Sequence, residues 1–176
     1  MRKSSVQTKS KEPKDNASAL ERVKFTLSVS PALVRGNLNL LESEHIIKKF
    51  REIADRIHDI NFTCRIPPFE RDAHGVFITL EENRAHLRQM LNFQKATGIT
   101  VSPVTNNIFV PNTSKNLSLF VENLKPLIDG GIRSITVPHV LWMKTGLIQK
   151  TFPGITIKNT VLRHVHNAQD FWNHAE

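Results

Sequence analysis

The feature that most constrains this fold is a glycine that recurs where a helical pattern stops and a strand pattern begins. The three stretches read GITVSPVTNN from Gly98, GIRSITVPHV from Gly131 and GITIKNTVLRHV from Gly154. Glycine readily takes the left-handed conformation that ends many helices, and the β-branched residues after it favour an extended strand. The recurrence therefore predicts repeated units of strand, helix and closing glycine.

Between these glycines, apolar residues recur at the spacing of helices, and alternating residues mark strands. The predicted strands cover residues 24–30, 60–66, 99–104, 132–137 and 155–162. The predicted helices run from about Ser43 to Ile57, from Thr79 to the residue before Gly98, from Leu117 to Ile128, and over residues 139–151. Thr79 and Glu82 have the spacing of a capping box, which predicts the start of the second helix.

Alternating strands and helices with short turns predict a parallel sheet with right-handed crossovers. The chain contains neither GxGxxG nor GxxxxGK(S/T), which weakens the case for a doubly wound nucleotide-binding fold. The alternative is part of a (β/α)8 barrel, which needs ~250 residues, whereas this chain has 176. We therefore expect an α/β domain over residues 21–176 that resembles the first half of a TIM-type barrel. A disordered basic tail is expected over residues 1–20.

The formal net charge of +8 leaves two interpretations open. A basic surface favours binding of nucleic acid or another polyanion. The other interpretation is a soluble domain with excess lysine, because no dense basic stripe stands out and the aromatic signature of RRM domains is absent. No apolar run approaches the ~20 residues of a membrane helix, so no membrane segment is expected.

Cys64 is the only cysteine, which limits both redox and metal chemistry. A single thiol excludes an internal disulfide, a cysteine-rich zinc site and an iron–sulfur cluster ligated by this chain alone. The cofactor is otherwise unknown, and a cytoplasmic location is the default for such a chain. We expect Cys64 to pack within a strand, as free cysteines commonly do, and not to act as a nucleophile.

Residues 24–176 resemble the N-terminal half of the peptidase U32-like barrel proteins. In that family a strand ending in Asn precedes a helix, followed by GG(I/V)xx(I/V)xV, a helix ending xxFPxIxIxxS, and a strand ending near Asn-Ala. The positions that fit this outline are Gly130, Gly131, Ile135, Val137, Phe152, Pro153, Ile155, Ile157, Asn167 and Ala168. The resemblance implies a partial barrel.

Relatives in this family carry protease annotations, and several resemble oxygen-independent hydroxylases that act on RNA bases or quinone precursors. Those hydroxylases use cysteine-ligated iron–sulfur clusters, with ligands mostly in the second half of the barrel. This sequence has neither that half nor those cysteines. We therefore expect a second chain or a second copy to close the barrel, because an open half barrel exposes apolar strand faces and edges.

In a parallel sheet the carboxyl ends of all strands meet at one rim, where the site of such folds lies. Asn106 and Asn107 follow the third strand and could hold a polar substrate through their amides, or form the turn after the strand. Arg65 and Arg163 lie near strand ends and could bind an anion such as a phosphate or carboxylate.

His164 and His166 are two residues apart, so they face the same side of an extended strand. With His139 they could form a three-histidine metal site with an open position for water or substrate. The alternative is that these histidines form hydrogen bonds at the rim or are simply exposed to solvent. Arg133, at a strand start, is expected to have a structural role, and Trp142 is expected to pack.

Three functions follow from these predictions. The first is an enzyme segment that binds a small polar or anionic substrate at the rim and needs a second chain or copy. The second is a noncatalytic basic module that binds RNA or protein. The third is a truncated relic with no independent activity.

Overall fold

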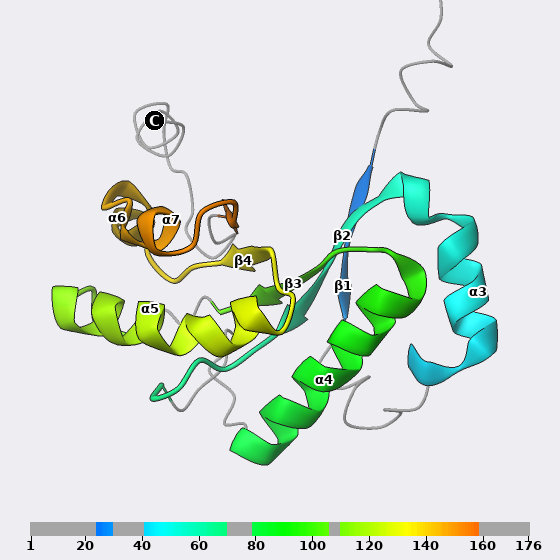
Figure 1. Ribbon diagram of the computed structural model, residues 1–176, viewed down its shortest axis with the longest axis horizontal. Helices are drawn as coiled ribbons and strands as arrows, with labels where there is room; N and C mark the ends of the chain where they lie inside the picture. Colours follow the sequence, from blue (N-terminus) through cyan, green and yellow to red (C-terminus); the bar gives the residue numbers. More distant parts are fainter. Residues whose placement is uncertain (1–23, 30–40, 70–78, 106–109, 159–176) are drawn as a thin grey trace, which may run out of the picture.

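The computed structural model describes residues 24–29, 41–69, 79–105 and 110–158, so the predicted tail lies outside the described residues. Five strands form one parallel sheet (Figure 1). The strands are β1 (Phe25–Val29), β2 (Ile57–Thr63), β3 (Val101–Val104), β4 (Ser134–Thr136) and β5 (Thr156–Lys158). They lie in the sheet in chain order, and each pairs in parallel with the next. The predicted α/β class with alternating strands and helices is confirmed.

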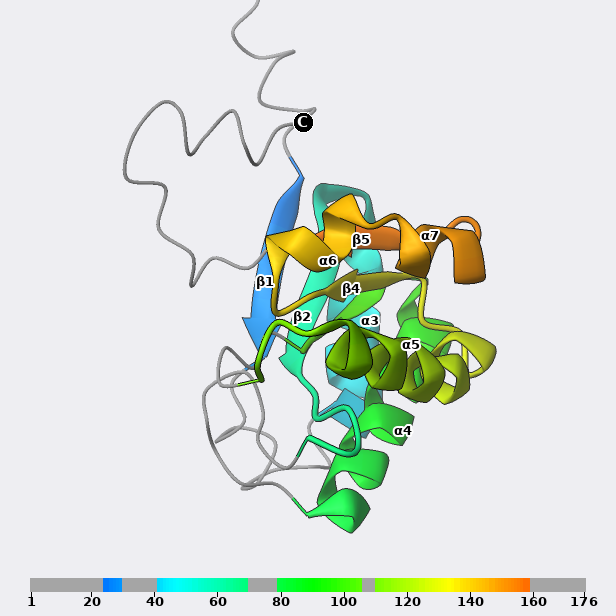
Figure 2. The ribbon, with the colours of Figure 1, turned by 90° about the vertical axis from the view of Figure 1, so that its left-hand side faces the viewer.

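Helices connect the strands. They are α3 (Glu44–Glu52), the 3-10 turn η2 (Ala54–Arg56), α4 (Leu80–Thr97), α5 (Ser114–Asp129), α6 (Val140–Lys144) and α7 (Leu147–Thr151). Figure 2 shows α3, α4 and α5 on the same side of the sheet. Within the described segments, no helix combines the length and the apolar composition needed to cross a membrane.

The sheet face toward these helices is apolar. Phe62 of β2 lies edge-on to His86 of α4, with ring centroids 5.3 Å apart. Phe50 of α3 packs against Phe93 of α4 at 5.1 Å. Burying a side chain of this size contributes about 1.5–3 kcal/mol relative to leaving it exposed. The fully buried residues on this face of the three central strands are Ile60, Phe62, Val101 and Ile135.

The helix ends follow the predicted local chemistry. The Thr79 side chain accepts from the Glu82 backbone N–H, and the Glu82 carboxylate accepts from the Thr79 backbone N–H, which completes the capping box. Gly98 caps the C-terminus of α4 with φ 77°, a left-handed conformation that disfavours any residue with a Cβ. Gly131 follows α5 with φ 111°. The closing glycines are therefore confirmed as helix terminators.

Three predicted elements have wrong bounds: the first helix, the strand over 60–66 and the helix over 139–151. The first helix ends at Glu52 and not near Ile57, because η2 turns the chain directly into β2, which starts at Ile57 and ends at Thr63. Ile57 continues the helical spacing of the preceding isoleucines and is out of phase with the apolar residues of β2, Ile60 and Phe62, because the register with β1 shifts there, so periodicity alone could not place it in the strand. The predicted helix over 139–151 is two short helices, since Gly146 adopts φ 67° between them.

Candidate functional site

Polar side chains line the sheet face opposite the helices, which we call the inner face. Residues in register on paired parallel strands project to the same face. Asn61 is in register with Ser102, and Ser134 with Thr156; Ser102 Oγ donates to Ser134 Oγ at 3.2 Å. The inner face comprises Thr26, Ser28, Asp59, Asn61, Thr63, Ser102, Val104, Ser134, Thr136, Thr156 and Lys158.

Lys158 of β5 joins Asp59 of β2 on this face. Lys158 Nζ donates to Asp59 Oδ2 and, at 3.0 Å, to Asn61 Oδ1. Thr26 Oγ1 of β1 donates to the other carboxylate oxygen, Asp59 Oδ1, at 2.8 Å. Side chains from β1 and β5 therefore converge on one carboxylate of β2.

This ion pair requires a strongly curved sheet. Two strands, β3 and β4, lie between β2 and β5. Neighbouring strands lie ~4.8 Å apart, so a flat sheet would separate β2 from β5 by about 14 Å, farther than a lysine side chain reaches. Because Lys158 does contact Asp59, the sheet curls and the inner face is its concave side.

Burial and charge give Asp59 and Lys158 different roles. The side chain of Asp59 is 1% exposed and that of Lys158 is 26% exposed. A buried carboxylate is tolerated only when it is paired and hydrogen-bonded, which Lys158 and Thr26 provide. The lysine ammonium has three N–H donors, and two of them bind Asp59 and Asn61. The third can bind an oxygen atom of a ligand.

Arg65, predicted to bind an anion, lies two residues beyond the end of β2. Its backbone N–H donates to Asn83 Oδ1 at 2.8 Å, and Asn83 Nδ2 donates back to the Arg65 carbonyl at 2.9 Å. Arg65 Nε donates to the Phe69 carbonyl at 2.8 Å. These contacts join Arg65 to α4 and to Phe69, four residues further along the chain. Binding of a ligand anion by Arg65 stays a prediction.

His139, predicted as a metal ligand, is the residue before α6. Its Nε2 donates to the Val110 carbonyl at 2.6 Å, and its ring lies edge-on to Trp142 with centroids 5.0 Å apart. Trp142 is buried, as predicted. Among the residues that the structure describes, no group of three or more His, Cys, Asp and Glu side chains could hold a metal ion.

The remaining predicted site residues lie outside the described residues. They are Asn106, Asn107, Arg163, His164 and His166. Their assignment to substrate or metal binding stays a prediction. Arg133, by contrast, has the expected structural role, because its guanidinium donates to the carbonyls of Ile128 and Ile132 at 2.7 and 2.8 Å.

Two buried titratable side chains lie away from the inner face. Burial raises the pKa of the Cys64 thiol to about 12, and its hydrogen bond with Asn83 offsets only part of that rise. Burial also lowers the pKa of His86 to about 4. Both groups are therefore uncharged at neutral pH. Cys64 is buried, as predicted, but it lies one residue beyond the end of β2 and not within the strand.

Sequence reasoning missed Asp59, Asn61 and Lys158. The signal that could have found the first two is the alternation of polar and apolar residues over 59–63. A parallel strand covered by apolar layers on both faces reads as a continuous apolar run, so alternation here indicates one polar face. Lys158 carries no comparable signal, because its partner is on a strand that is not its neighbour.

Comparisons of the chain with protein-family models, with curated proteins and with solved structures found no match.

Proposed function

We propose that this chain is a partial U32-like barrel protein whose inner face binds a small polar ligand carrying an anionic or carbonyl oxygen. The observation that carries the proposal is the contact of Lys158 with buried Asp59, which fixes a cation on a concave polar surface. The proposed site is centred on this pair, and Lys158 lies at the carboxyl end of β5. The predicted roles of Asn106 and Asn107 stay predictions.

The geometry favours a small oxygen-rich ligand. The lysine ammonium attracts an anion or a carbonyl oxygen, and the neighbouring hydroxyls of Thr136 and Thr156 can both donate and accept hydrogen bonds. One lysine side chain spans the concave side from β5 to β2, so its ammonium lies among side chains of both strands. Asp59 holds the ammonium in place, so Lys158 can polarise a bound carbonyl or hold a carboxylate.

We further propose that a second chain or a second copy completes the sheet beside β1. Among the described strands β1 is an edge strand, since it pairs only with β2. Its Phe25 and Leu27 side chains are 57% and 36% exposed. An exposed edge with apolar side chains is a typical pairing surface, so mass measurement in solution tests whether the protein assembles.

A ligand screen tests the inner-face site directly. Thermal unfolding would be measured with small carboxylates and sugar phosphates, and with neutral polyols for comparison. We expect anionic compounds to raise the Tm of the wild type but not of Lys158→Met, because binding to the folded state stabilises it. Lys150→Met, at an exposed position on α7, is the matched control. Equal Tm shifts in wild type and Lys158→Met would contradict the proposal.

A further inference from the structure

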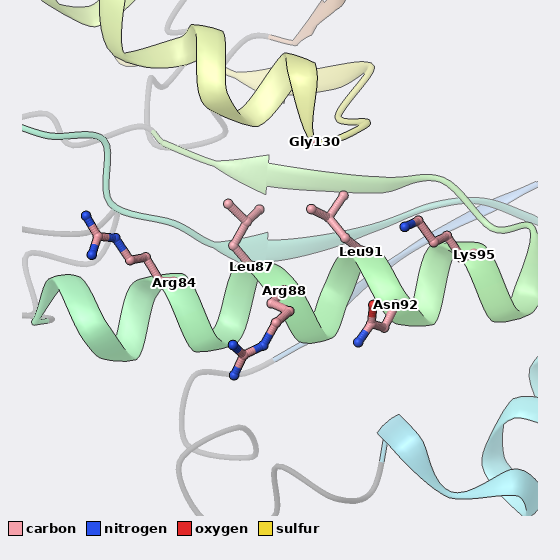
Figure 3. Close-up of a pocket in the computed structure, with 7 residues that line it drawn as sticks. All are labelled: Arg84, Leu87, Arg88, Leu91, Asn92, Lys95 and Gly130. Carbon is pink, nitrogen blue, oxygen red and sulfur yellow. The ribbon is translucent and has the colours of Figure 1, made fainter.

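A second surface lies on the opposite side of the sheet, along α4. A pocket of about 250 Å³ runs between α4 and the end of α5. Figure 3 shows Leu87 and Leu91 on the side of α4 toward Gly130, with Arg84 and Lys95 at either end of this row, whereas Arg88 extends from the other side of the helix. We call these residues, together with Asn92, the α4 groove.

The floor of the groove is apolar and fixed by packing. Leu87 and Leu91 are half-buried and pack against the core. Gly130 keeps the end of α5 close to them, since a Cβ at that position would lie 3.3 Å from Leu91 Cδ1. Pockets for small molecules have volumes of about 300–1,000 Å³, so the volume here suits one or two apolar side chains better than a complete ligand.

The rim of the groove is cationic. Arg84, Arg88 and Lys95 are exposed, and none of them forms a salt bridge with the described residues. No carboxylate lines the groove. Exposed lysines on neighbouring helices do have partners: Lys49 pairs with Glu52, and Lys125 with Asp129. The groove thus combines an apolar floor with three cations that have no carboxylate partner among the described residues.

We propose that the α4 groove binds an acidic amphipathic helix of a partner protein. Arg84 and Lys95 are eleven residues apart on α4, which corresponds to about 16 Å along the axis, or three helical turns. A helix of about 12 residues spans this length, and one of about 14 residues extends past both ends of it. Its leucines, spaced four residues apart, would contact Leu87 and Leu91, and its glutamates would face the cations, as in other helix-in-groove complexes.

Nucleic acid fits the groove less well. Proteins that hold single strands stack bases on aromatic side chains, and no aromatic residue lines the groove. The two leucines of the floor have no charge or hydrogen-bond donor for a phosphate group, whereas they can pack against a leucine side chain. The site is independent of the inner face, because the sheet separates the two.

The test is fluorescence anisotropy with the full chain and a labelled helical peptide of about 14 residues, carrying leucines on one face flanked by glutamates. A scrambled peptide of equal composition and a labelled single-stranded oligonucleotide serve as competing probes. The key variant is Arg84→Glu/Arg88→Glu. The matched control is Lys144→Glu/Lys150→Glu, which makes the same charge change at exposed positions on α6 and α7.

We expect the amphipathic peptide to bind more tightly than its scrambled form. The groove variant should weaken binding at least ~10-fold, and the control variant less than ~3-fold, since the latter changes only the overall field. Equal binding of both peptides, or equal loss in both variants, would overturn the proposal. Tighter binding of the oligonucleotide that depends on Arg84 and Arg88 would overturn it in favour of a nucleic-acid surface. Circular dichroism of each variant confirms that it folds.

Discussion

Lys158 of β5 donates a hydrogen bond to Asp59 of β2 across two intervening strands. This one contact reports the curvature of the sheet, because a flat sheet would hold the two strands too far apart. It also sets the charge of the inner face, since it neutralises a carboxylate that is 1% exposed. Shape and electrostatics of the candidate site therefore depend on the same pair.

Removing the cation should destabilise the fold. Lys158→Met keeps the apolar stem but leaves Asp59 buried without its counter-ion, so we expect the free energy of unfolding to fall by about 1–3 kcal/mol. Lys158 is 26% exposed, which keeps the loss below that of a fully buried pair. Urea denaturation gives the value. Asp59→Asn in the Lys158→Met background should recover part of the loss; strictly additive effects would contradict a direct interaction.

Asn83 should contribute more to stability than other asparagines of α4. Asn83→Ala removes both hydrogen bonds to the Arg65 backbone and leaves a buried N–H and a buried carbonyl unsatisfied. We expect a loss of about 2–3 kcal/mol in the free energy of unfolding. Asn92→Ala, at an exposed position of the same helix, is the matched control and should change it by less than about 0.5 kcal/mol. Similar losses for both variants would contradict this role of Asn83.

Acidification should destabilise the protein through His86. Its pKa is about 4 in the folded state and 6.5 in the reference state, so the unfolded chain binds a proton more readily. Stability is therefore complete above pH ~6.5 and falls as the pH drops toward 4, by about 2–3 kcal/mol in total. His86→Leu, which cannot titrate, should remove this part of the pH dependence. Chemical denaturation between pH 7 and 4 measures both proteins; parallel curves would contradict the prediction.

Substitution of Gly98 should destabilise the protein because of the backbone conformation at this position and not because of steric crowding. Its φ is 77°, and an added Cβ would meet nothing within 4 Å. We expect Gly98→Ala to lower the free energy of unfolding by about 1–2 kcal/mol, and Gly98→Asn to lower it less, since Asn tolerates the left-handed region. Thermal unfolding compares the two variants. An equal loss for both would indicate that something other than φ determines the cost.

Local features of this fold follow from short stretches of sequence. The capping box needs only Thr79 and Glu82, three residues apart. The left-handed cap needs only Gly98, and the helix face of α4 needs only its own periodicity. Each depends on neighbours within a few residues, so a single sequence is sufficient to predict it.

The inner face depends on contacts that no local pattern encodes. Asp59 and Lys158 are separated by 99 residues, and they meet only because strand order, register and curvature combine. Arg65 was placed near the end of a predicted strand over 60–66, but β2 ends at Thr63. Arg65 therefore lies just beyond the strand, in a segment held by Asn83.

The position of Lys158 also determines when the inner face can form during synthesis. A ribosome makes Asp59 long before it makes Lys158, because the two are 99 residues apart. Until β5 emerges, the carboxylate of β2 has no cation from β5, and its burial carries a cost that only the later strand offsets. The last described strand thus completes the concave site. Because the contact of Lys158 with Asp59 joins distant parts of the chain, we expect the sheet to reach its folded form late in synthesis.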